Sequence, residues 1–169
     1  DCLSRVPFLV KPPKGRAVEP RVSDALVELT DFSATVYDLT GIEPGYSSFG
    51  KSLLPLIAGD TDEHRDAVFC EGGRLYGEGH ASEANLMEAN GLYYPRQRLQ
   101  ASDQKPWHGK AVMCRTRMLK YVKRFYERDE FYDLEKDPHE LENRIDDPAY
   151  REYKQRTPAL FLRRPRPTD

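Results

Sequence analysis

The sequence has few cysteines and no long apolar run. Its three cysteines, Cys2, Cys70 and Cys114, are odd in number and far apart, so a disulfide framework is not expected, and no C-x-x-C pair indicates zinc. No stretch approaches the roughly 18 apolar residues of a transmembrane helix, so no membrane partner is predicted. The formal net charge of -2 lacks the basic excess typical of nucleic-acid-binding proteins, so no nucleic-acid partner is expected.

The 169 residues that are present suffice for one ordinary domain with a hydrophobic core. Charged residues make up 32% and apolar residues 38%, which is polar but not a disordered composition. The continuous apolar run Val6-Pro7-Phe8-Leu9-Val10 predicts a strand buried on both faces, as in a parallel sheet. Such a strand needs neighbours, and the remaining sequence offers few. We therefore expect the sequence to be the later part of a longer chain.

Two helices are predicted before residue 60. Apolar residues recur at helical spacing between Ser23 and Gly41. Asp31 is a candidate N-cap, which leaves the start open, whereas Gly41 suits the left-handed position that closes a helix. A short helix is expected over 52–57, ending at Gly59.

The later half predicts an antiparallel sheet with a helix against it. Strand patterns cover 66–71, 111–115, 119–126 and 131–134, and the middle two form a hairpin. Asp147 and Pro148 begin a last helix over 149–156. The stretch 72–109 has little regular pattern, and a segment of this kind is often functional.

The segment that follows the last strand predicts a further helix start. Asp137 can cap it, Pro138 at the first helical position loses only an unpartnered N–H, and Glu140 completes a capping-box pattern.

Six segments, in consistent order, resemble motifs of bacterial sulfatases of the alkaline-phosphatase superfamily. Residues 130–143 resemble the closing "ELYDLxxDPxExxN" segment. The others are residues 6–15 ("RVPLIVxxPG"), 29–42 ("LVDLxPTLLxLAGI"), 50–56 ("GxSLLPLL"), 65–71 ("RDAVFSE") and 115–121 ("RTxxYKY"). The resemblance covers most of residues 5–150.

The resemblance implies sulfate-ester hydrolysis in the complete enzyme by a formylglycine from a C-x-P-x-R or S-x-P-x-R motif, with a divalent cation, usually calcium. Neither such a motif nor an acidic cluster that resembles the cation site is found in this sequence. Cys70 to Arg74 has the spacing but lacks the proline, so Cys70 is interpreted as a half-buried structural thiol. Residues 60–63 are interpreted as a solvated turn. No catalytic residue or metal ligand is therefore predicted in this chain.

Charged residues in and around the irregular stretch are candidates for the rim of a substrate pocket, because such side chains can bind a sulfate or a sugar. They are Arg74, Glu78, His80, His108 and Lys110. The alternative is a surface loop whose charges face water. His64 and His139 are expected to be exposed.

The predicted fold class is α/β, with an α+β C-terminal part. Residues 1–60 would end a sulfatase-like catalytic domain, residues 61–160 would form an antiparallel subdomain of about four strands with a packed helix, and residues 161–169 a flexible tail. The predicted function is that of the C-terminal portion of a sulfatase-family hydrolase. Its expected partners are the missing N-terminal catalytic part and a sulfate-ester substrate. A phosphodiester or phosphonate-ester hydrolase of the same superfamily, or a non-catalytic binding module, remains as an alternative.

Overall fold

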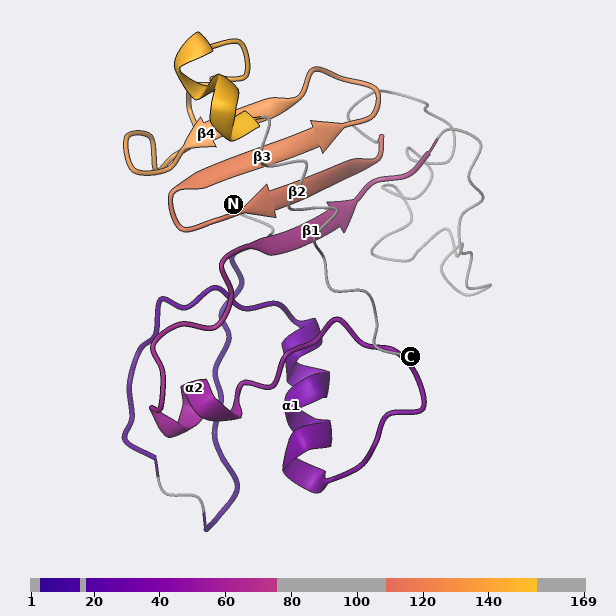
Figure 1. Cartoon of the computed structure of the whole chain (residues 1–169), viewed down its shortest axis with the longest axis vertical. Coiled ribbons are helices and arrows are strands. Elements are labelled where there is room, and N and C mark those ends of the chain that lie inside the picture. The colour runs from indigo at the N-terminus through magenta and orange to yellow at the C-terminus, as the bar shows by residue number, and fades with distance from the viewer. Residues whose placement is uncertain (1–3, 16–17, 76–108, 155–169) are drawn as a thin grey trace, which may run out of the picture.

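A small antiparallel sheet forms the centre of the fold. The computed structural model describes residues 4–15, 18–75 and 109–154 (Figure 1). The strands are β1 (Val68–Gly72), β2 (Ala111–Arg115), β3 (Leu119–Arg124) and β4 (Glu130–Asp133), in the order β1-β2-β3-β4. Helices α1 (Thr30–Thr40) and α2 (Leu54–Ala58) lie beyond the β1 edge, and the turn-rich segment after β4 lies beyond the opposite edge. The predicted mixed fold with a four-stranded antiparallel sheet is confirmed.

Cross-strand pairs supply most of the core. Phe69 pairs with Cys114, Cys114 with Tyr121, and Tyr121 with Phe131, so one row of side chains crosses all four strands. Cys114, Tyr121 and Phe131 are buried. The adjacent row includes buried Met113 and points to the other face, because side chains alternate along a strand.

Helices α1 and α2 both end at a glycine in a left-handed conformation. Gly41 closes α1 at φ 68° with its N–H donated to the Tyr37 carbonyl, and Gly59 closes α2 at φ 85°. Both ends were predicted. Helix α1 begins at Thr30, and Asp31 lies inside its first turn, so the prediction that Asp31 caps this helix is wrong.

Residues 6–10 do not form the predicted strand. They have no strand conformation, and Leu9 is 96% exposed. A strand is stabilised by ladder hydrogen bonds to a neighbour, and the described strands β1 to β4 pair only with one another.

The predicted helix after Asp137 is replaced by turns. The Asp137 carboxylate accepts the Glu142 N–H at 2.8 Å, and Glu140 adopts a left-handed φ of 58°. The Glu140 side chain forms an ion pair with the Lys120 ammonium at 2.6 Å, so it does not complete a capping box. Asn143 binds this segment to β4, because its Oδ1 accepts the Phe131 N–H at 3.0 Å.

A helical segment at the end of the described chain packs against the sheet. The Asp147 carboxylate accepts the Ala149 N–H at 2.9 Å and caps a 3-10 helix, η3 (Pro148–Tyr150), which continues helically over 151–154. The rings of Tyr150 and Phe131 lie 5.3 Å apart. The predicted cap and packed helix are confirmed as far as residue 154. The predicted tail, 161–169, lies outside the described residues. Among the described residues, no helix is long and apolar enough to span a bilayer.

Candidate functional site

Arg74 and Lys110, two of the predicted rim residues, lie side by side. The Lys110 N–H donates to the Arg74 carbonyl at 2.7 Å, and Arg74 forms an isolated parallel bridge with Gly109. The chain thus returns to the end of β1 just before β2 begins. Glu78, His80 and His108 lie outside the described residues.

Glycine permits this close return of the chain. Gly73 has φ 70°, and a Cβ built on it would lie 2.1 Å from the carbonyl oxygen of Gly109. A side chain at residue 73 would therefore push the two segments apart and separate Arg74 from Lys110. Glu71 at the end of β1 forms an ion pair with the Lys110 ammonium. Both cationic residues are half-buried at this corner, which combines positive charge with one carboxylate.

A buried ionic centre joins α1 to the segment before β1. The Asp31 carboxylate is 0% exposed and accepts hydrogen bonds from the Arg65 Nε at 2.9 Å and from the backbone N–H groups of Glu28 and Lys51, at 2.9 and 2.8 Å. Burial opposes ionisation of this carboxyl group. The hydrogen bonds from Arg65 and the two backbone groups outweigh that effect and lower the pKa of Asp31.

His64 is a member of this centre, so the prediction that it is exposed is wrong. Its side chain is only 3% exposed, and its Nε2 lies 3.1 Å from the Asp31 carboxylate. Burial lowers the pKa of His64 in spite of the neighbouring Asp31 charge, so the ring is neutral at neutral pH. His139, in contrast, is exposed as predicted.

The sequence pattern gave little indication of this centre. Asp31 was interpreted as a cap and His64 as a surface residue because no periodic signal joins residues so far apart in the chain. The informative signal was the pair His64-Arg65 directly before a strand, together with a helix-borne carboxylate. All of the described polar contacts of this ionic centre are made to other residues of the same chain, which is typical of a structural role.

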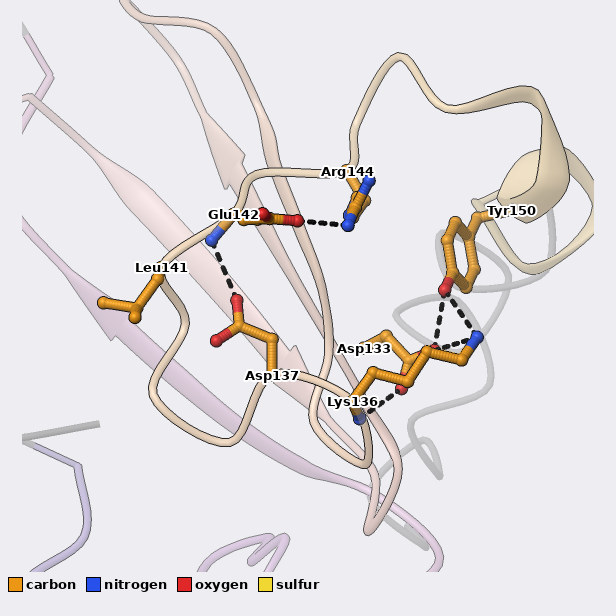
Figure 2. Close-up of a pocket in the computed structure, with 7 residues that line it drawn as sticks. All are labelled: Asp133, Lys136, Asp137, Leu141, Glu142, Arg144 and Tyr150. Carbon is orange, nitrogen blue, oxygen red and sulfur yellow. Dashed lines mark hydrogen bonds and ion pairs between the residues drawn. The ribbon is translucent and has the colours of Figure 1, made fainter.

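A hollow of about 220 Å³ lies where the chain turns after β4 (Figure 2). It is lined by Asp133, Lys136, Asp137, Leu141, Glu142, Arg144 and Tyr150.

The polar groups of this hollow pair with one another. The Tyr150 hydroxyl donates to the Asp133 carboxylate at 2.7 Å, Lys136 pairs with Asp133 at 3.1 Å, and Arg144 pairs with Glu142 (Figure 2). The Tyr150 hydrogen bond, followed by those from Lys136, lowers the pKa of Asp133 to about 2. These contacts hold the turn-rich segment and η3 on the sheet, which indicates a structural role for the hollow.

The described residues do not fit a metal or formylglycine centre. No group of three or more His, Cys, Asp or Glu side chains among them could hold a metal ion. Cys70 is free and exposed, which corrects the prediction of a half-buried thiol, because it lies on β1, an edge strand of the described sheet with a neighbouring strand on one side only. Cys114 is free and buried.

No protein-family model and no curated protein matches this chain. Solved structures do. A phosphonate monoester hydrolase from Silicibacter pomeroyi is similar at 21% identity and TM-score 0.54, over 79% of this chain and 24% of that protein. Another, from Agrobacterium radiobacter, is similar at 23% identity and TM-score 0.53, over 80% and 25%. A 2-O GAG sulfatase is similar at 22% identity and TM-score 0.52, over 78% and 23%.

The fold of this chain is therefore that of a C-terminal sulfatase-like part. The chain spans about a quarter of the length of these proteins. Sulfatases and phosphonate monoester hydrolases both occur among the proteins that share this fold.

Proposed function

We propose that this chain is the C-terminal part of a sulfatase-type hydrolase whose nucleophile and metal ligands lie in an N-terminal part. The observation that carries the proposal is the shared fold, which covers 78% of the chain in the 2-O GAG sulfatase. The ordered sulfatase-like motifs across residues 5–150 support it independently. The proposal includes the domain boundaries expected from the sequence: residues 1–60 would end the catalytic domain, and residues 61–160 would form the antiparallel subdomain.

The reaction of the complete enzyme would be hydrolysis of a sulfate ester. A formylglycine, with calcium or another divalent cation beside it, would supply the nucleophile and the positive charge there. Because the described residues of this chain do not fit either group, the chain is assigned no step of the chemistry.

The role proposed for this chain is at the rim of the substrate pocket. Arg74 and Lys110 are held together at one corner by the Lys110 N–H bond to the Arg74 carbonyl. Their cationic groups suit a sulfate or a sulfated sugar, since charged donors make the stronger hydrogen bonds to anionic oxygens. Glu78, His80 and His108 are proposed as further members of this rim.

A phosphonate monoester is the second candidate substrate. Two of the similar structures are phosphonate monoester hydrolases, and one of them has 23% identity to this chain. The two reactions place negative charge at similar positions, so the same cationic rim would serve either.

The test is activity of this chain alone and with the polypeptide encoded upstream, on an aryl sulfate and on an aryl phosphonate monoester. We expect no turnover by residues 1–169 alone and turnover of one substrate by the combination. Arg74→Ala and Lys110→Ala should raise KM more than they lower kcat, because a rim residue binds the ground state and transition state alike.

The control variant is Arg117→Ala, in the exposed turn between β2 and β3, which should leave both constants unchanged. Turnover by residues 1–169 alone would refute the proposed division of labour. A combination inactive on both substrates would favour the non-catalytic binding module.

A further inference from the structure

Helix α1 turns polar residues toward the protein interior. Its buried residues are Asp31 and Thr35. The Thr35 hydroxyl donates to the Asp31 carbonyl at 2.6 Å and accepts the Leu53 N–H at 2.8 Å. A surface helix of a soluble protein normally buries its apolar stripe and exposes its polar side. In α1 the buried side chains are instead polar.

The apolar residues of α1 and its N-cap lie on a different side of the helix. Leu29, Phe32, Val36 and Leu39 are spaced three, four and three residues apart, so they line one side. They are 69%, 58%, 40% and 38% exposed, respectively. We call these four residues the α1 apolar face. None of them carries a charge.

The α1 apolar face does not belong to the core of this chain. Among the described residues, the buried apolar side chains are Leu53, Leu56, Met113, Cys114, Tyr121, Val122 and Phe131. All of them follow α1 in the sequence. A contiguous apolar surface exposed in this way marks an interaction site in soluble proteins.

We propose that the α1 apolar face docks against an apolar surface of the N-terminal part of a sulfatase-type catalytic domain. This inference rests on the proposed function and names the surface through which the two parts join. The chain spans only 23% to 25% of the similar proteins, so most of such a fold would lie outside it. In α/β domains a helix buries its apolar stripe on the layer beside it. An uncharged face suits such a permanent contact better than a transient one.

The experiment is co-purification of the tagged 169-residue chain with the polypeptide encoded directly upstream. Wild type should retain it. Phe32→Asp and Val36→Asp should each weaken retention about tenfold or more, because a charge would be buried without a partner. The matched control is Asp38→Lys, which changes the charge at an exposed position of the same helix two residues from Val36 and therefore on another side, and it should bind as wild type does.

Thermal unfolding of the chain alone separates docking from folding. Because Phe32 is largely exposed, Phe32→Asp should leave Tm unchanged, and a marked fall in Tm would place the residue in this chain's own core and overturn the proposal. Retention of Phe32→Asp at the wild-type level would also overturn it. So would a wild-type dimer, seen by sedimentation, that Phe32→Asp dissociates, because the occupant would then be a second copy.

Activity measured on the same preparations separates this inference from the proposed function. A complex that needs Phe32 but turns over neither a sulfate nor a phosphonate ester supports the docking surface and refutes the proposed activity. An active complex that tolerates Phe32→Asp refutes the docking surface alone.

Discussion

Asp31 and Arg65 form an ion pair in which the carboxylate is fully buried and the guanidinium is largely so. The Arg65 Nε donates to the carboxylate at 2.9 Å, and a second guanidinium nitrogen donates to the Phe49 carbonyl at 2.9 Å. The pair therefore fixes three segments at once: helix α1, the loop before α2 and the approach to β1. Its loss should loosen all three.

Replacing Asp31 by asparagine should strongly destabilise the chain. The substitution removes the negative charge opposite Arg65, and breaking a buried pair on one side costs about 3–5 kcal/mol of unfolding free energy. Urea denaturation monitored by circular dichroism measures the loss. The control is Asp38→Asn at an exposed position of α1, where a change within about 0.5 kcal/mol is expected. Equal stability of the two variants would contradict a buried ionic centre.

Acid should weaken the same centre, beginning at the pKa of an unfolded histidine. Burial lowers the pKa of His64, so the unfolded state binds a proton that the folded state resists. Stability is then fully present above about pH 6.5 and falls as the pH decreases below that value. Asp31, whose pKa is also lowered, adds a second loss at more acidic pH.

The variant His64→Gln isolates the histidine contribution. Its unfolding free energy should change less between pH 7 and pH 5 than that of wild type, whatever its absolute stability. His139→Gln, at an exposed position, should keep the wild-type slope. Parallel profiles for wild type and His64→Gln would show that His64 titrates alike in the folded and unfolded states.

Cys70 and Cys114 should differ sharply in reactivity. Cys114 is buried, and burial raises the pKa of its thiol to about 11, whereas Cys70 is exposed. In a Cys2→Ser background, a thiol reagent at pH 8 should modify Cys70 in the folded protein and Cys114 only on unfolding, since the thiolate reacts. Mass spectrometry of the labelled peptides identifies the site. Rapid labelling of Cys114 under native conditions would contradict the core described by the sheet register.

Removing the Tyr150 hydroxyl should raise the pKa of Asp133. That hydroxyl donates at 2.7 Å and is the largest cause of the lowered value, about 2. In Tyr150→Phe the carboxyl group should titrate closer to its ordinary range, as measured by carbon NMR of the side chain. Tyr46→Phe, in the loop after α1, serves as the control and should leave Asp133 unchanged. An unaltered Asp133 in Tyr150→Phe would mean that Lys136 alone sets its pKa.

The elements predicted correctly are those set by local patterns. Two strand-like segments separated by residues 116–118 predicted the hairpin of β2 and β3, and Gly41 and Gly59 marked the helix ends. The segment after β4 was predicted wrongly because its capping pattern also fits a turn. There Glu140 pairs with Lys120, a residue 20 positions earlier, so a distant contact decides the conformation.

The candidate site was predictable only in part. Arg74 and Lys110 were chosen for their charge, and their proximity follows from the pairing of β1 with β2, which no local pattern specifies. The Asp31 centre was missed for the same reason, since its partners come from α1, the loop at Lys51 and the residues before β1. Val6 to Val10 predicted a buried strand from composition alone, whereas burial depends on a neighbouring surface.

The order of the strands has a consequence for how the chain folds. Strands β2, β3 and β4 are joined by short turns, so each pairing closes only a small loop and forms early. Strand β1 ends at Gly72, and its partner β2 begins only at Ala111, so its addition requires closure of a much longer stretch. The corner formed by Arg74 and Lys110 exists only after this step. The rim proposed for substrate would therefore be among the last features to form and among the first lost in partial unfolding.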